Sequence, residues 1–83
     1  MNQIVSLEIA KFLKLNGYNK TTEWFYLDKN LAFCPAGLKK TKNDKKINHN
    51  KYDEFIYSAP TNLAAIIFLN KHKIHKPFEI KFI

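Results

Sequence analysis

The four residues Ser-Ala-Pro-Thr at positions 58–61 constrain the fold of this chain more than any other stretch. Residues 52–59 (YDEFIYSA) lead into this stretch and include its first two residues. Their alternating side chains are typical of a β-strand. Pro60 has no backbone N–H to donate to a sheet, and it disfavours helical geometry at Ala59. The sequence therefore predicts that a strand ends here and that a different element follows.

A helix is predicted directly after this turn. Thr61 is its expected N-cap, and over 62–73 the apolar period changes from two to about 3.6 residues. Phe68 and Leu69 lie off the predicted buried stripe, so this helix is apolar around most of its circumference. Either the first helix covers the remaining apolar surface, or a second copy of the chain does. The stripe predicted to face the core consists of Leu63, Ile66, Ile67 and Ile74.

An amphipathic helix is also predicted near the N-terminus. Ser6 is its expected N-cap, and Gly17 suits a left-handed C-cap after Asn16. The apolar face of this helix consists of Val5, Ile9, Phe12 and Leu13. The opposite, solvent-facing side is expected to carry Glu8, Lys11 and Lys14.

Three further segments are predicted to be strands, and one a turn. Residues 21–27 (TTEWFYL) are rich in β-branched and aromatic side chains, and a turn at 28–30 with a return strand at 31–34 completes a predicted hairpin. Residues 77–83 (PFEIKFI) alternate as a C-terminal strand. The predicted order is α-β-β-β-α-β within one small domain, 1–83. We expect an α+β fold with two helices packed on one face of a three- or four-stranded, mainly antiparallel sheet.

The segment 38–51 separates these elements and carries six lysines against one aspartate. It shows neither helical nor strand periodicity, so a mobile lysine-rich loop is predicted there. The whole chain has a net charge of +7, and all of its basic residues are lysine. Without arginine, sequence-specific reading of DNA is disfavoured, whereas non-specific attraction to phosphates remains open. Coding bias of an AT-rich genome is a second explanation for the lysines.

The lysine-rich segment is the leading candidate for a partner-binding surface. Basic side chains interleaved with aromatic rings suit single-stranded nucleic acid. The alternative is a solvated loop that keeps a small apolar protein in solution. The candidate partner-binding residues are Lys39, Lys40, Lys42, Lys45, Lys46, Trp24, Tyr26 and Phe68.

Catalytic and metal-binding patterns are weak in this sequence. His72 and His75 have the spacing of two metal ligands, but lysines flank them and no motif completes the set. Cys34 is the only cysteine, which fits a reducing cytosol. The longest apolar run, 63–69, is far shorter than the roughly 20 residues of a membrane span. We therefore expect no enzyme, metal, cofactor or membrane partner, and a cytoplasmic location.

Two segments carry a resemblance to a known group of proteins. VSLEIAKFLKLNGY (5–18) and IYSAPTNLAAIIFLNKHKIH (56–75) resemble small hypothetical proteins from phages and prophages of Bacteroidetes-type bacteria. The lysine-rich segment lies outside the resemblance, and Phe68 stands where those proteins often carry tryptophan. The resemblance implies a phage accessory protein that binds a host protein or nucleoprotein in the host cytoplasm and inhibits a host defence system. The alternative is a general nucleic-acid-binding protein, and a homodimer remains open.

Overall fold

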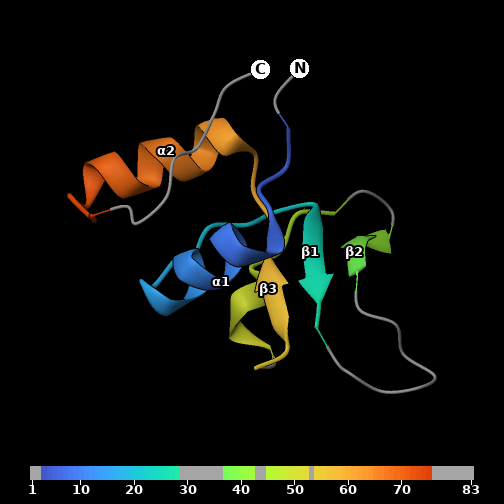
Figure 1. Cartoon of the computed structure of the whole chain (residues 1–83). Helices are drawn as coiled ribbons and strands as arrows, with labels where there is room; N and C mark the ends of the chain where they lie inside the picture. The colour runs from blue at the N-terminus through green and yellow to red at the C-terminus, as the bar shows by residue number, and fades with distance from the viewer. Residues whose placement is uncertain (1–2, 29–36, 43–44, 53, 76–83) are drawn as a thin grey trace.

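The computed structural model describes residues 3–28, 37–42, 45–52 and 54–75. It confirms the α+β class, with two helices and a three-stranded antiparallel sheet among these residues (Figure 1). The predicted strands at 31–34 and 77–83 lie outside the described residues. The elements are α1 (Leu7–Leu15), β1 (Trp24–Leu27), β2 (Gly37–Lys40), the 3-10 helix η2 (His49–Lys51), β3 (Ile56–Ser58) and α2 (Asn62–Lys71).

Strand β1 is the centre of the sheet, whose strand order is β2-β1-β3. Leu27 pairs with Gly37 of β2 on one side and with Ile56 of β3 on the other, and both pairings are antiparallel. Both edges of β1 are thus occupied by described strands. Among the described residues, the first antiparallel partner that follows β1 in the sequence is Gly37–Lys40, and the predicted return strand at 31–34 lies outside them.

The finding of β2 also corrects the predicted loop over 38–51. Lys39 and Lys40 are exposed residues of an edge strand. Further along the same segment, Ile47 forms an isolated antiparallel bridge with Thr22. An edge strand needs no apolar periodicity, because the pairing uses backbone groups and lysines on an edge remain in solvent. The lysine-rich segment consequently contains regular structure that its side-chain pattern did not reveal.

Both helices are capped in the same way at their N-termini. The Ser6 side chain accepts a hydrogen bond from the backbone N–H of Ile9 (3.3 Å), and that of Thr61 accepts one from Ala64 (3.2 Å). Each cap occupies one backbone donor that the first turn of a helix leaves unpaired. The two predicted N-caps are confirmed.

Both helices also end in the same hydrogen-bonded motif. Tyr18 N–H donates to the carbonyl of Leu13, and Ile74 N–H donates to that of Leu69, each over 2.9 Å. These are the bonds of a Schellman motif, which needs a residue of positive φ just before the donor. Gly17 supplies it after α1 with a φ of 82°, as predicted, whereas Lys73 supplies it after α2 with a φ of 52°.

The core lies where α1, α2 and one face of the sheet meet. Helix α1 lies across the sheet, and α2 lies above α1 and beyond the end of β3 in Figure 1. The rings of Tyr18 and Phe68 meet edge to face with centroids 4.9 Å apart, which joins α2 to the residue that follows α1. The buried apolar residues are Val5, Ala10, Leu13, Tyr18, Ala59, Ala65, Phe68 and Leu69.

The N-terminal segment pairs with the chain just before α2. Ile4 and Thr61 form an isolated antiparallel bridge, the Val5 N–H donates to the Pro60 carbonyl (3.0 Å), and the Asn62 N–H donates to the Gln3 carbonyl (2.8 Å). These bonds place the start of α2 next to the segment that precedes α1.

Candidate functional site

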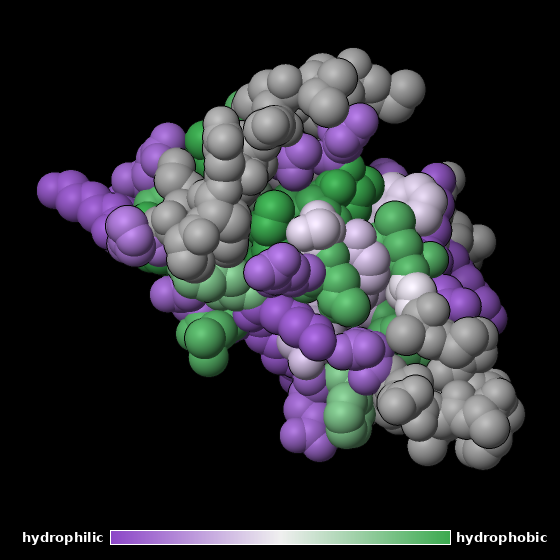
Figure 2. Space-filling view, viewed as in Figure 1, coloured by the Kyte–Doolittle hydropathy of each residue, from purple (hydrophilic) through white to green (hydrophobic). Residues whose placement is uncertain are grey.

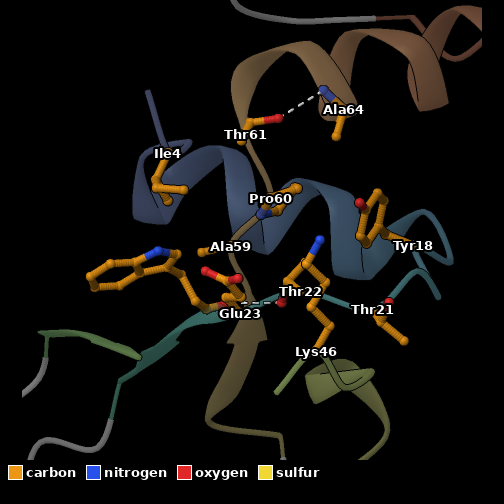
Figure 3. A pocket seen from close by; sticks show the side chains of 11 residues that line it. Ile4, Tyr18, Thr21, Thr22, Glu23, Lys46, Ala59, Pro60, Thr61 and Ala64 are labelled. Atoms are coloured by element: carbon orange, nitrogen blue, oxygen red, sulfur yellow. Dashed lines mark hydrogen bonds between the residues drawn. The ribbon is translucent and has the colours of Figure 1, made fainter. Parts of the chain in front are cut away.

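A groove opens where the N-terminal segment, the start of β1 and the start of α2 meet (Figure 3). Its volume of about 380 Å³ is near the lower end of the range for small-ligand sites, roughly 300–1,000 Å³. We call it the Trp24 groove. It is lined by Ile4, Tyr18, Thr21, Thr22, Glu23, Trp24, Lys46, Ala59, Pro60, Thr61 and Ala64.

Local pairing holds the two sides of the groove in place. On one side, the bridge between Ile4 and Thr61 fixes the N-terminal segment against the start of α2. On the other, Thr22 and Ile47 exchange backbone hydrogen bonds of 2.9 and 3.2 Å, so the neighbouring Lys46 is carried to the groove. The groove is thus built by contacts between segments that are distant in the sequence.

The charged side chains of the groove come from Glu23 and Lys46. Both extend into the space beneath Pro60 in Figure 3. A third charge lies close by, because Lys40 Nζ lies over the indole of Trp24, 5.8 Å from the ring centroid. Such a cation–π contact is electrostatically favourable. The groove therefore presents an aromatic surface next to two ammonium groups and one carboxylate.

The structure brings together three of the eight predicted partner-binding residues, namely Trp24, Lys40 and Lys46. Lys39 is the cross-strand partner of Phe25, whereas Lys40 is that of Trp24. Because successive side chains of a strand point to opposite faces, Lys39 lies on the face of the sheet opposite Trp24. Lys42 and Lys45 are exposed residues that do not line the groove.

The other two predicted aromatic residues contribute to the core: Phe68 is buried within it, and the partly buried Tyr26 packs against it. The Tyr26 hydroxyl donates to the Val5 carbonyl over 2.7 Å, and burial raises the pKa of Tyr26. Phe68 is only 6% exposed and packs against Tyr18. Tyr26 thus binds the segment that precedes α1, and the Phe68 side chain is not accessible to a partner.

Helix α2 presents a different face to solvent from the one predicted. Leu63 is 40% and Ile67 57% exposed, although both belong to the stripe predicted to face the core. The buried residues of α2 are Ala65, Phe68 and Leu69. Because apolar residues surround α2, periodicity alone did not distinguish its inner face from its outer face. We call Leu63 and Ile67, which are one helical turn apart, the α2 stripe.

The surface around α1 does not form one continuous apolar patch. Figure 2 shows apolar side chains interrupted by hydrophilic ones on the face that α1 covers. Lys14, predicted to face solvent, instead donates from Nζ to the Ile56 carbonyl over 2.8 Å and lies 4.9 Å from the Tyr57 ring centroid. Lys11 forms an ion pair with Asp28 (2.7 Å), and this hydrogen bond raises the pKa of Lys11.

His49 is buried on the face of the sheet opposite α1. Its ring stacks on Phe25 with centroids 4.4 Å apart, and its Nε2 lies 2.8 Å from Thr41 Oγ1 and 3.1 Å from the Thr22 carbonyl. Since that carbonyl can only accept, Nε2 carries the proton that it donates. Burial lowers the pKa of His49, and the bond to Thr22 opposes this effect in part. His49 thus fastens η2 over the sheet.

The described residues contain no group of three or more His, Cys, Asp or Glu side chains that could hold a metal ion. Cys34 lies outside this part of the chain, and the ring of His72 rests against Phe68 with centroids 4.6 Å apart. Neither α1 nor α2 has the length and apolar character that crossing a membrane requires, within the ranges that the structure describes.

The described residues form a small α+β fold that carries the Trp24 groove and the exposed α2 stripe. Comparison of the chain with protein-family models, with curated proteins and with solved structures gave no match.

Proposed function

We propose that the protein acts by binding another protein through the α2 stripe and does not act as an enzyme. The observation that carries the proposal is the exposure of Leu63 and Ile67 on a helix whose opposite side supplies Phe68 and Leu69 to the core. Two apolar side chains one turn apart on an exposed helix are the kind of anchors that a partner's groove receives.

The charge of α2 defines the chemistry of the partner. Asn62–Lys71 contains no acidic residue, and Lys71 follows Ile67 by four residues on the same face. His72, Lys73 and His75 are also exposed at this end of the helix. A partner surface with apolar side chains flanked by carboxylates complements this arrangement, because opposite charges favour encounter and fix orientation.

A second copy of the chain fits the α2 stripe less well. Each copy carries a net charge of +7, and α2 offers no carboxylate to the Lys71 of another copy. Like charges brought together across an interface oppose association. We therefore propose an acidic partner protein. The resemblance to phage accessory proteins extends this proposal to a host protein, with inhibition of a host defence system as the consequence.

The experiment compares three forms of the chain as bait in lysate of a Bacteroidetes-type host. These are the wild type, the double variant Leu63→Ser/Ile67→Ser, and the matched control Leu15→Ser, whose leucine is 85% exposed on α1. Captured proteins are identified, purified and titrated against the same three forms by calorimetry. We expect an acidic protein that binds the wild type and Leu15→Ser but loses at least about tenfold in affinity with the double variant.

Two results would contradict this proposal. One is a purified partner whose affinity is the same for the wild type and the double variant. The other is a dimer in analytical ultracentrifugation that the double variant abolishes, which would assign the α2 stripe to self-association.

A further inference from the structure

The Trp24 groove combines three chemical groups that the α2 stripe lacks. Trp24 is the only tryptophan of the chain, and its partly exposed indole forms part of the groove wall. An aromatic face of this kind stacks with a nucleobase, and it does so without strong preference because every base has a π-face. A groove of about 380 Å³ suits one unpaired base with its sugar.

Two ammonium groups lie at or next to the groove. Lys40 Nζ lies 5.8 Å from the centroid of the Trp24 ring, and Lys46 extends into the groove itself (Figure 3). The two lysines come from different segments. Lys40 is the last residue of β2, and Lys46 directly precedes Ile47, which forms the bridge with Thr22. A phosphate next to a base in the groove is therefore within the surroundings of both lysines, and lysine neutralises phosphate as a point charge.

The negative charge of Glu23 distinguishes one side of the groove from the side that carries the lysines. Its carboxylate lines the same space as Lys46 and repels phosphate, so the phosphate backbone is expected on the lysine side. A carboxylate accepts hydrogen bonds from an exocyclic amino group, as it does from N4 of cytosine. Thymine has no amino group, so Glu23 favours cytosine over thymine at this position.

From this arrangement we infer that the Trp24 groove binds one base of a single-stranded nucleic acid. The base stacks on Trp24, Lys40 and Lys46 contact the flanking phosphates, and Glu23 accepts a hydrogen bond from the amino group of the base. This inference concerns a surface separate from the α2 stripe and does not depend on it.

The fluorescence of Trp24 tests the inference directly, because no second tryptophan contributes. Short oligo(dC), oligo(dT) and a DNA hairpin duplex are titrated against the full chain at several salt concentrations from about 50 mM upward. The variants are Lys40→Ala/Lys46→Ala and Glu23→Ala. The control is Lys71→Ala/Lys73→Ala, which removes the same charge at the far end of α2. Circular dichroism checks that each variant folds.

We expect oligo(dC) to quench Trp24 and to bind at least about fivefold more tightly than oligo(dT). Removing two phosphate contacts should lower the slope of log K against log salt by about 1.4, since each contact to a single strand contributes about 0.7. Lys71→Ala/Lys73→Ala should leave that slope unchanged. Glu23→Ala should bring the oligo(dC) to oligo(dT) ratio close to one, whereas a merely structural role of Glu23 would weaken both oligonucleotides equally.

Three outcomes would overturn the inference. The first is the absence of any quenching at about 50 mM salt. The second is an equal loss of affinity in the α2 control and in Lys40→Ala/Lys46→Ala, which would show diffuse attraction to a basic protein. The third is duplex binding as tight as single-strand binding, since a paired base cannot enter the groove.

Discussion

Asn50 and Ser58 hydrogen-bond to each other in both directions. The Ser58 N–H donates to Asn50 Oδ1 over 2.7 Å, and the Asn50 N–H donates to Ser58 Oγ over 3.2 Å. Asn50 Nδ2 also donates to the Tyr18 carbonyl over 2.9 Å. One side chain thus connects η2, the edge strand β3 and Tyr18, which follows the C-terminus of α1.

Asn50→Ala should lower the free energy of unfolding by about 2–3 kcal/mol, because Ser58 is fully buried and its N–H would lose its partner. Urea denaturation followed by circular dichroism measures the change. Asn48→Ala is the matched control, since Asn48 Oδ1 is buried without a hydrogen-bond partner among the described residues. That substitution should change stability by less than about 0.5 kcal/mol or increase it. Equal losses in the two variants would contradict this account.

The stability of the protein should fall as the pH is lowered below about 6.5, the ordinary pKa of histidine. Burial lowers the pKa of His49 in the folded chain, so the unfolded chain binds the proton first. The contribution of neutral His49 is complete above pH 6.5 and is lost as the pH falls toward the lower folded pKa.

Urea denaturation at a series of pH values from about 7.5 to 5 measures this dependence. His49→Gln removes the titrating group at a similar size, so its stability curve should be flatter over the same interval. A wild-type curve that remains parallel to that of the variant would assign the pH dependence to other groups.

Lys73→Gly should stabilise the protein by about 0.5–1 kcal/mol. Lys73 has a φ of 52°, a left-handed conformation that costs a residue with a Cβ more than it costs glycine. The same motif after α1 supplies the reverse test. Gly17→Ala should destabilise by about 1 kcal/mol, because its φ is 82° although a Cβ there would meet no atom within 4 Å. The midpoints of urea denaturation report both changes, and a destabilised Lys73→Gly variant would contradict the prediction.

The two sides of α2 should differ sharply in their tolerance of substitution. Leu69→Ala removes a fully buried side chain and should cost about 2–5 kcal/mol. Ile67→Ala alters a side chain that is 57% exposed and should cost less than about 1 kcal/mol. Thermal denaturation of both variants makes the comparison. The reverse order would show that the stripe predicted from the sequence faces the core.

Sequence alone predicted the features that short-range chemistry controls. Ser6 and Thr61 cap the helices because their side chains reach a backbone N–H three residues away, and Gly17 ends α1 because it adopts a positive φ readily. Pro60 separates β3 from α2 because it has no N–H to donate. Each of these effects depends on neighbours within one turn of chain, so no knowledge of the fold was needed.

Only the tertiary structure decided which apolar surfaces face inward and which segments meet. Helix α2 is apolar all round, so its packing against Tyr18, and not its own pattern, buries Phe68 and exposes Ile67. Strand β2 forms because its backbone pairs with that of β1, although its lysine side chains show no pattern typical of a strand. The Trp24 groove exists because Ile4 pairs with Thr61 and Thr22 pairs with Ile47. Such pairings join residues far apart in the chain, and their geometry is set by the packing of the whole protein.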